Sequence, residues 1–191
     1  MKFKYILTLF IFILIGCSFY SFKGSIPAHI KSVHVSPIKN NTIESSASDI
    51  IKTELQKAFI NENILKLLPV ENSDSRLDLT VTSFTDKPYS YNVEDISTTG
   101  YEVVDLYRVD IKAKVKWHDL KNDIVLFDQN FSGWASYDPQ NDIGSDGIDN
   151  DNDSFIDDKD DDEFGAPRES AIKIASRQIT ESIISNIIST W

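Results

Sequence analysis

Apolar and polar side chains alternate without a break between Tyr107 and Trp117. The apolar positions are Tyr107, Val109, Ile111, Ala113, Val115 and Trp117. The positions between and just after them are Arg108, Asp110, Lys112, Lys114, Lys116 and His118. Because successive side chains of a strand point to opposite faces, this pattern predicts a strand in a sheet with one buried and one solvated face.

Three further strands are predicted from shorter patterns. Residues 30–35 form a β-branched segment that stops before Pro37, and residues 77–84 alternate between apolar and polar side chains. After a turn at 119–123, residues 124–137 return as the partner of the alternating strand, so the two form a hairpin. The side chains expected on one face of this last strand are Val125, Phe127 and Phe131.

Glycine and proline mark two irregular places in these strands. Gly133 predicts a bulge or a close approach of another backbone in the last strand. Pro88 interrupts the alternation that ends at residue 84, so residues 87–100 are predicted to form a loop.

Two helices complete the set of elements. The first is placed near residues 45–61, where Ser45 or Ser48 can cap its start and the apolar stripe is Ile51, Leu55 and Phe59. The second begins at Pro167 and includes the final 25 residues, with an apolar series of Ala171, Ala175, Ile179, Ile183 and Ile187. The order β-α-β-β-β-α predicts an α+β fold with two helices on one face of a four-stranded sheet.

The N-terminus has the layout of a bacterial export signal. Two lysines precede a short apolar run from Tyr5 to Ile15, which is too short to span a bilayer stably. The run ends in Leu14-Ile15-Gly16-Cys17, which resembles the lipobox of bacterial lipoproteins. Residues 1–16 are therefore expected to be cleaved, and Cys17 to carry a covalent lipid such as palmitate. The alternative is a buried structural cysteine, but the chain has only one cysteine and cannot form an internal disulfide.

Nearly all of the excess negative charge lies in one segment. Residues 138–163 hold twelve acidic side chains against Lys159 alone, which accounts for the whole net charge of −11. We treat residues 138–165 as an acidic insertion, because two to six residues would suffice to join the last strand to the last helix. No basic tract suggests nucleic acid as a partner.

The insertion contains a twelve-residue stretch, 149–160, that resembles the calcium loop of EF-hands. The predicted ligands are Asp149, Asp151, Asp153, Phe155 through its carbonyl, Asp157 and Asp160. Two positions depart from the pattern: Ser154 replaces the turn glycine, and Asp160 replaces the longer glutamate. A structural Ca²⁺ ion is one interpretation, and an acidic loop that binds nothing is the other.

None of the motifs G-x-S-x-G, P-loop, H-E-x-x-H and C-x-x-C occurs in the chain, and the three histidines have no helix-spaced partner. We therefore predict that the protein is not an enzyme. A hydrolase whose residues assemble from distant parts of the chain is the remaining catalytic alternative.

Several fragments in this order resemble the lipopolysaccharide-assembly lipoprotein family (LptE-like). They follow the lipobox at residues 20–24, 26–42, 77–91, 107–119 and 131–137, and the terminal Trp191 completes the set. The resemblance covers the mature chain except for the acidic insertion. It divides the chain into a signal peptide (1–16), a lipid anchor and tether (17–29) and an LptE-like domain (30–191).

The resemblance implies a protein held in the outer membrane by its lipid. Such proteins plug the lumen of an LptD-like barrel and help to deliver lipopolysaccharide to the cell surface. The basic residues that could meet lipopolysaccharide phosphates are Arg108, Lys112, Lys114 and Lys116, although a merely solvated strand face predicts the same residues. The alternative function is that of a lipid-anchored periplasmic scaffold or pilot protein stiffened by calcium.

Overall fold

The computed structural model describes residues 26–94, 101–141, 143–150, 154–156 and 166–189. The predicted signal peptide and Cys17 lie outside these residues. The elements follow one another as β1 (Ser32–Val35), β2 (Lys39–Asn40), α2 (Ser45–Glu62), β3 (Lys66–Leu67), the 3-10 helix η2 (Val70–Asn72), β4 (Ser75–Glu94), β5 (Tyr101–Asp119), β6 (Ile124–Tyr137) and α3 (Pro167–Ser189).

The described strands form one mixed sheet in the order β3-β1-β4-β5-β6, and β2 also pairs with β4. The pairs of β4 with β5 and of β5 with β6 are antiparallel, whereas β1, β2 and β3 make only parallel pairs. The prediction of four strands was therefore wrong, because the sheet has six. The two additional strands, β2 and β3, span two residues each, which is too short to show any alternation in the sequence.

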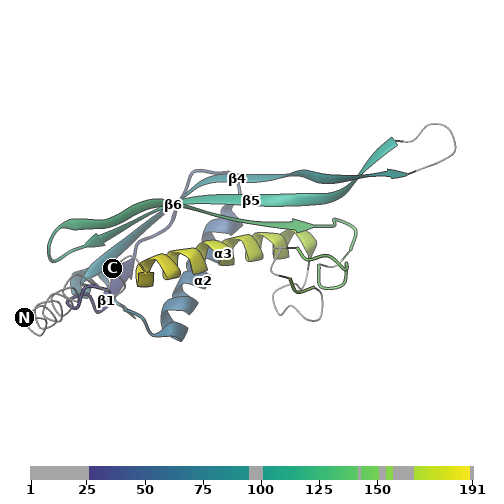
Figure 1. Cartoon of the computed structure of the whole chain (residues 1–191). Coiled ribbons are helices and arrows are strands. Elements are labelled where there is room, and N and C mark those ends of the chain that lie inside the picture. The colour runs from purple at the N-terminus through teal and green to yellow at the C-terminus, as the bar shows by residue number, and fades with distance from the viewer. Residues whose placement is uncertain (1–25, 95–100, 142, 151–153, 157–165, 190–191) are drawn as a thin grey trace, which may run out of the picture.

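Both helices cover the same face of this sheet, and Figure 1 shows α2 and α3 below the long strands. This arrangement confirms the predicted α+β packing. Strand β5, between β4 and β6, supplies much of the core, since every apolar position from Val109 to Trp117 on this strand is fully buried. The predicted helix stripes are also buried, from Ile51 to Phe59 in α2 and from Ala171 to Ile187 in α3.

Gly133 lies where β6 packs directly against α3. A Cβ atom at this position would collide with the backbone carbonyl of Ala175 and would also meet the Ile179 side chain at 3.2 Å. The sequence left open a bulge or a close approach, and the structure has the close approach. The register shift between β5 and β6 falls elsewhere, between Trp117 and His118, and Val125 beyond it is exposed rather than packed with Phe127.

The loop predicted at residues 87–100 was wrong for its first half, because β4 continues to Glu94 and β5 already begins at Tyr101. Pro88 lies beside a register shift in the pairing of β4 with β5, and β4 has no described neighbour on its outer side there; bulges and edge strands are the places where a sheet tolerates proline. Pairing between β5 and β6 ends at Tyr107, so the hairpin of β4 and β5 projects as a two-stranded ribbon (Figure 1).

A polar cluster fastens the start of α3 to the rest of the fold. Arg168 donates from Nη2 to Glu44 Oε2 at 2.8 Å and from Nε to Asp86 Oδ2 at 2.7 Å. The Tyr137 hydroxyl donates to the other Asp86 oxygen at 3.0 Å. Hydrogen bonds from Ser46 and Arg168 lower the pKa of Glu44. Helix α3 is thereby tied to β4, to β6 and to the residue that caps α2.

Candidate functional site

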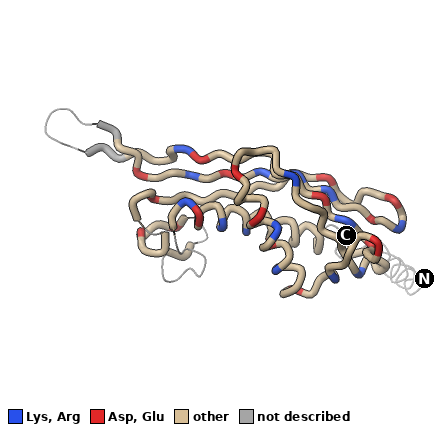
Figure 2. Tube along the Cα trace, turned by 180° about the vertical axis from the view of Figure 1, so that it is seen from behind, with Lys and Arg blue, Asp and Glu red and all other residues tan. Residues whose placement is uncertain are grey.

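The face of the sheet that the helices leave uncovered carries the charged side chains of the three long strands. The alternate residues of β5 point to this open face, and Figure 2 shows basic and acidic residues close together along these strands. The register sets opposite charges side by side, with Lys116 between Asp78 of β4 and Asp128 of β6. The sequence prediction of a solvated face opposite the core is confirmed.

One end of the open face is hollowed, with a cavity volume of about 520 Å³. We name it the basic hollow. Its cationic or titratable basic residues come from three strands and are Lys39, Arg76, Lys114, Lys116 and His118. Its acidic residues are Asp78 and Asp128. Basic groups therefore outnumber carboxylates, which suits the binding of a phosphorylated or other anionic ligand.

Ion pairs neutralise some of these groups but not all. Lys114 Nζ lies 3.1 Å from Asp128 Oδ1, and Arg76 Nε lies 3.0 Å from Asp78 Oδ2. His118 Nε2 is 3.5 Å from the same oxygen of Asp78. Within the described part of the chain, neither Lys39 nor Lys116 makes an ion pair. These two ammonium groups are therefore the ones available to an incoming anion.

The structure brings all four predicted basic residues to the open face but gives them different surroundings. Lys114 and Lys116 line the basic hollow, whereas Lys112 lies further along β5 beside a second, smaller hollow. Arg108 is paired with Asp110 and lies over the ring of Trp134, with its Cζ atom 4.1 Å from the ring centroid. Among these four residues, Lys112 and Lys116 therefore carry the positive charges without an ion-pair partner in the described part of the chain, whereas the Arg108 charge is neutralised.

The sequence reasoning missed three members of the basic hollow: Lys39, Arg76 and His118. Two of them had a signal, since the alternation places Arg76 one step before Leu77, and His118 directly continues the polar face of β5. Lys39 had none, because it reaches the sheet through the parallel pairing of β2 with β4.

The acidic insertion is anchored to the domain by two buried residues. Ile143 is fully buried in the core, and so is Asn150 at the end of β6. Asn150 Nδ2 donates to the Ser136 carbonyl at 2.9 Å, and Ser136 N–H donates back to the Asn150 carbonyl at 2.7 Å. The start of the insertion is therefore a packed part of the fold, which its composition did not indicate.

Of the six predicted calcium ligands, Asp149 and Phe155 lie within the described residues. The others, Asp151, Asp153, Asp157 and Asp160, lie outside them. Asp149 Oδ2 accepts a hydrogen bond from the Ser154 N–H at 3.0 Å, and Ser154 has a φ of 81°. Ser154 thus has the left-handed conformation that glycine adopts at this place in EF-hands. Among the described side chains, no group of three possible ligands gathers.

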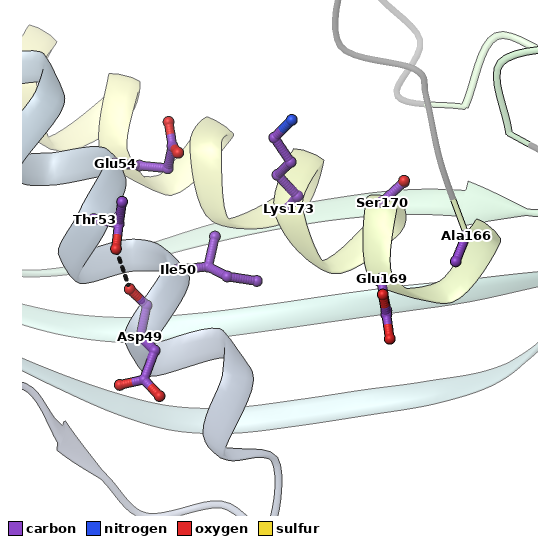
Figure 3. Close-up of a pocket in the computed structure, with 8 residues that line it drawn as sticks. All are labelled: Asp49, Ile50, Thr53, Glu54, Ala166, Glu169, Ser170 and Lys173. Atoms are coloured by element: carbon purple, nitrogen blue, oxygen red, sulfur yellow. Dashed lines mark hydrogen bonds between the residues drawn. The ribbon is translucent and has the colours of Figure 1, made fainter.

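A groove of about 450 Å³ separates α2 from the start of α3 on the opposite side of the molecule. Figure 3 shows Ile50 pointing from α2 towards α3, with Lys173 on the facing helix. Burial lowers the pKa of Lys173. The other charged side chains here are the carboxylates Asp49, Glu54 and Glu169, so this groove is less suited to an anionic ligand than the basic hollow.

The first described residues lie near the end of the sheet opposite the projecting β4–β5 ribbon. His29 Nε2 is 2.7 Å from Asp119 Oδ2, at the last residue of β5. Burial opposes ionisation of Asp119, but hydrogen bonds from His29, Asn122 and Lys121 hold its pKa below the ordinary value. Neither described helix combines the length and apolar character needed to cross a bilayer.

A protein-family model described as LptE: Lipopolysaccharide-assembly matches residues 30–187. Comparison with curated proteins gives no significant match. Among solved structures, a Xanthomonas campestris protein has a TM-score of 0.51 at 12% identity, covering 88% of this chain and 92% of its own. This likeness concerns the fold alone.

Two other solved structures resemble the chain more weakly. A hypothetical protein from Chlamydia trachomatis has a TM-score of 0.49 at 8% identity, covering 84% of this chain and 97% of its own. A putative lipoprotein from Caulobacter crescentus has a TM-score of 0.43 at 10% identity, covering 80% and 88% respectively.

Proposed function

Because the chain belongs to the LptE lipopolysaccharide-assembly family, we propose that it is an outer-membrane lipoprotein that plugs an LptD-type barrel and assists lipopolysaccharide transport. The family match over residues 30–187 is the observation that carries this proposal. The family is one of non-enzymatic lipoproteins, which agrees with the prediction that the chain catalyses no reaction.

The shape and polarity of the fold support a role inside a barrel. Two helices and a sheet form a wedge whose uncovered face is polar, and the lumen of a large outer-membrane barrel is polar as well. A wedge of this kind can therefore fill such a lumen without exposing a large apolar surface to the water inside it.

The basic hollow supports contact with lipopolysaccharide itself. Phosphate groups bind well to ammonium and guanidinium groups through charge-assisted hydrogen bonds. Lys116 and Lys39, without ion-pair partners in the described part of the chain, offer such groups at one place on the open face. Lys112 extends the basic surface along β5 towards Arg108.

Attachment through Cys17 completes the proposed function. Acyl chains contribute about 0.8 kcal/mol per buried methylene, so a multiply acylated cysteine would hold the protein in the membrane durably. Labelled palmitate should be incorporated into the wild-type protein but not into Cys17→Ala. Equal incorporation into both would contradict lipidation at this residue.

The partner is tested by pull-down from detergent-solubilised envelopes through a C-terminal tag. We expect a large barrel protein in equimolar amount, together with lipopolysaccharide. Recovery of the protein alone would contradict the proposal and favour the periplasmic scaffold or pilot. Turnover of an envelope substrate that is lost on mutating one nucleophile would favour the hydrolase.

We further propose that the acidic insertion binds a structural Ca²⁺ ion through Asp149, Asp151, Asp153, Phe155, Asp157 and Asp160. The Ser154 conformation and its bond to Asp149 support an EF-hand-like path at the start of the loop. An ion bound only by the folded state stabilises that state. Millimolar Ca²⁺ should therefore raise the melting temperature of the wild-type protein more than that of Asp149→Asn. Equal shifts would contradict a site at Asp149.

A further inference from the structure

Beyond the basic hollow, the open face carries a second feature, in which a guanidinium group lies against two aromatic rings. The Arg108 Cζ atom on β5 is 4.1 Å from the Trp134 ring centroid on β6 and 5.4 Å from the Tyr89 ring centroid on β4. The three side chains come from three adjacent strands but are not directly opposite one another: Trp134 is the register partner of Asp110, and Tyr89 lies at a register shift after Pro88. We name these three side chains the aromatic stack.

The aromatic stack is not built like a phosphate site. Arg108 Nε donates a hydrogen bond to Asp110 Oδ1 at 3.1 Å, and Arg108 Nη2 forms an ion pair with the same oxygen at 3.0 Å. That carboxylate neutralises the guanidinium charge and would repel a phosphate. Among the described residues, Arg108 Nη1 and Asp110 Oδ2 have no hydrogen-bond partner, so one donor group and one acceptor remain beside the rings.

An aromatic ring beside a donor and an acceptor whose charges cancel is suited to bind a sugar ring. Such a ring presents an apolar C–H face for packing on an aromatic side chain and hydroxyl groups that both donate and accept hydrogen bonds. Tyr89 is 55% exposed, so most of its surface is available for packing. We propose that the aromatic stack is a saccharide-binding subsite, in which Tyr89 packs against a sugar ring while Arg108, which lies over the Trp134 ring, and Asp110 bind its hydroxyl groups.

The position of the stack indicates an extended ligand. Lys116 in the basic hollow and Arg108 in the stack are eight residues apart on β5, or about 27 Å along the strand. One phosphate or one sugar ring cannot touch both places, whereas a phosphorylated glycan chain can. The inference rests on the proposed function in one respect: lipopolysaccharide is the phosphorylated glycan that this protein would meet.

The competing explanation is that these side chains only pack against one another and bind no ligand. Cation–π attraction to Arg108 would then only shield the Trp134 ring on the wet face of an edge strand. That role needs the ring of Trp134 but not the largely exposed ring of Tyr89. Removal of the Tyr89 ring therefore separates a ligand role from a structural one.

The test uses the full-length lipoprotein in detergent and a neutral probe, a dephosphorylated heptose and hexose oligosaccharide of the lipopolysaccharide core from which the acidic sugars have been removed. Calorimetric titration should show binding to the wild-type protein and to Tyr89→Phe, which keeps the ring. Tyr89→Ala should bind about tenfold more weakly, with an unchanged melting temperature. Lys116→Glu should bind the neutral probe as the wild type does, because its charge lies in the basic hollow.

Two results would overturn the proposal: no binding of the neutral oligosaccharide by the wild-type protein, or equal binding by Tyr89→Ala. Neither of these results touches the recovery of a barrel partner, so failure of the subsite and failure of the proposed function remain distinguishable.

Discussion

The contact between β6 and α3 at Gly133 predicts a large cost for adding one methyl group. In Gly133→Ala, the new Cβ atom would fall on the Ala175 carbonyl, which belongs to a helix backbone and cannot turn aside as a side chain could. Overpacking of a core costs about 1–3 kcal/mol, and a backbone obstacle places this site at the upper end. Alanine recovers roughly 0.5–1 kcal/mol because glycine disfavours ordered strands. The net expected loss is about 2 kcal/mol.

Differential scanning calorimetry and urea unfolding measure this loss. For a chain of this size, a loss of about 2 kcal/mol lowers the melting temperature by roughly 4–8 °C. Ser132→Ala is the matched control, because Ser132 is the exposed neighbour of Gly133 on the same strand. It should change the unfolding free energy by less than about 0.5 kcal/mol. If Gly133→Ala were as stable as Ser132→Ala, the close approach of β6 and α3 would be refuted.

Two further predictions concern polar contacts. The pKa of Glu44 is lowered by hydrogen bonds from Ser46 and Arg168, so its stabilising effect is complete above its ordinary pKa of 4.5 and is lost as the pH falls through the lower folded value. Glu44→Gln should lower the free energy of unfolding by roughly 1 kcal/mol at pH 7, a modest value because Arg168 is partly exposed. The stability of this variant should also decline less steeply below pH 4.5. Identical pH profiles of variant and parent would contradict this. Asn150→Ala should cost about 1–3 kcal/mol and speed amide hydrogen exchange of Ser136, because it removes the buried donor to the Ser136 carbonyl, whereas exposed Asn141→Ala should leave that exchange unchanged.

The sequence predicted β5 and both helices because their periodic patterns are long. Eleven alternating residues from Tyr107 and a four-step series through Ile179 each identify one buried face. The sequence could not predict β2 and β3, because a two-residue strand is defined by its neighbours in space. It also placed a loop at Pro88, because a proline predicts the end of a strand unless that strand is known to have no neighbour on its outer side.

The candidate site was predictable in part for the same reason. Alternation placed Lys112, Lys114 and Lys116 on one wet face, but it could not show that Asp128 on β6 neutralises Lys114. Nor could it show that Arg108 would lie between aromatic rings of two other strands. Both facts depend on strand register, which a single sequence does not state.

The proposed role of the open face is tested most directly by the amount of lipopolysaccharide that copurifies with the protein. The double variant Lys112→Glu/Lys116→Glu reverses the two charges without ion-pair partners on β5 in the described structure. Lys52→Glu/Lys57→Glu also reverses two lysine charges, on α2 on the other face of the sheet, where Lys57 is paired with Glu54. We predict that the β5 variant retains its barrel partner and loses most of the bound lipopolysaccharide, and that the α2 variant keeps both. Equal lipopolysaccharide content in the two variants would contradict binding at the basic face of the sheet.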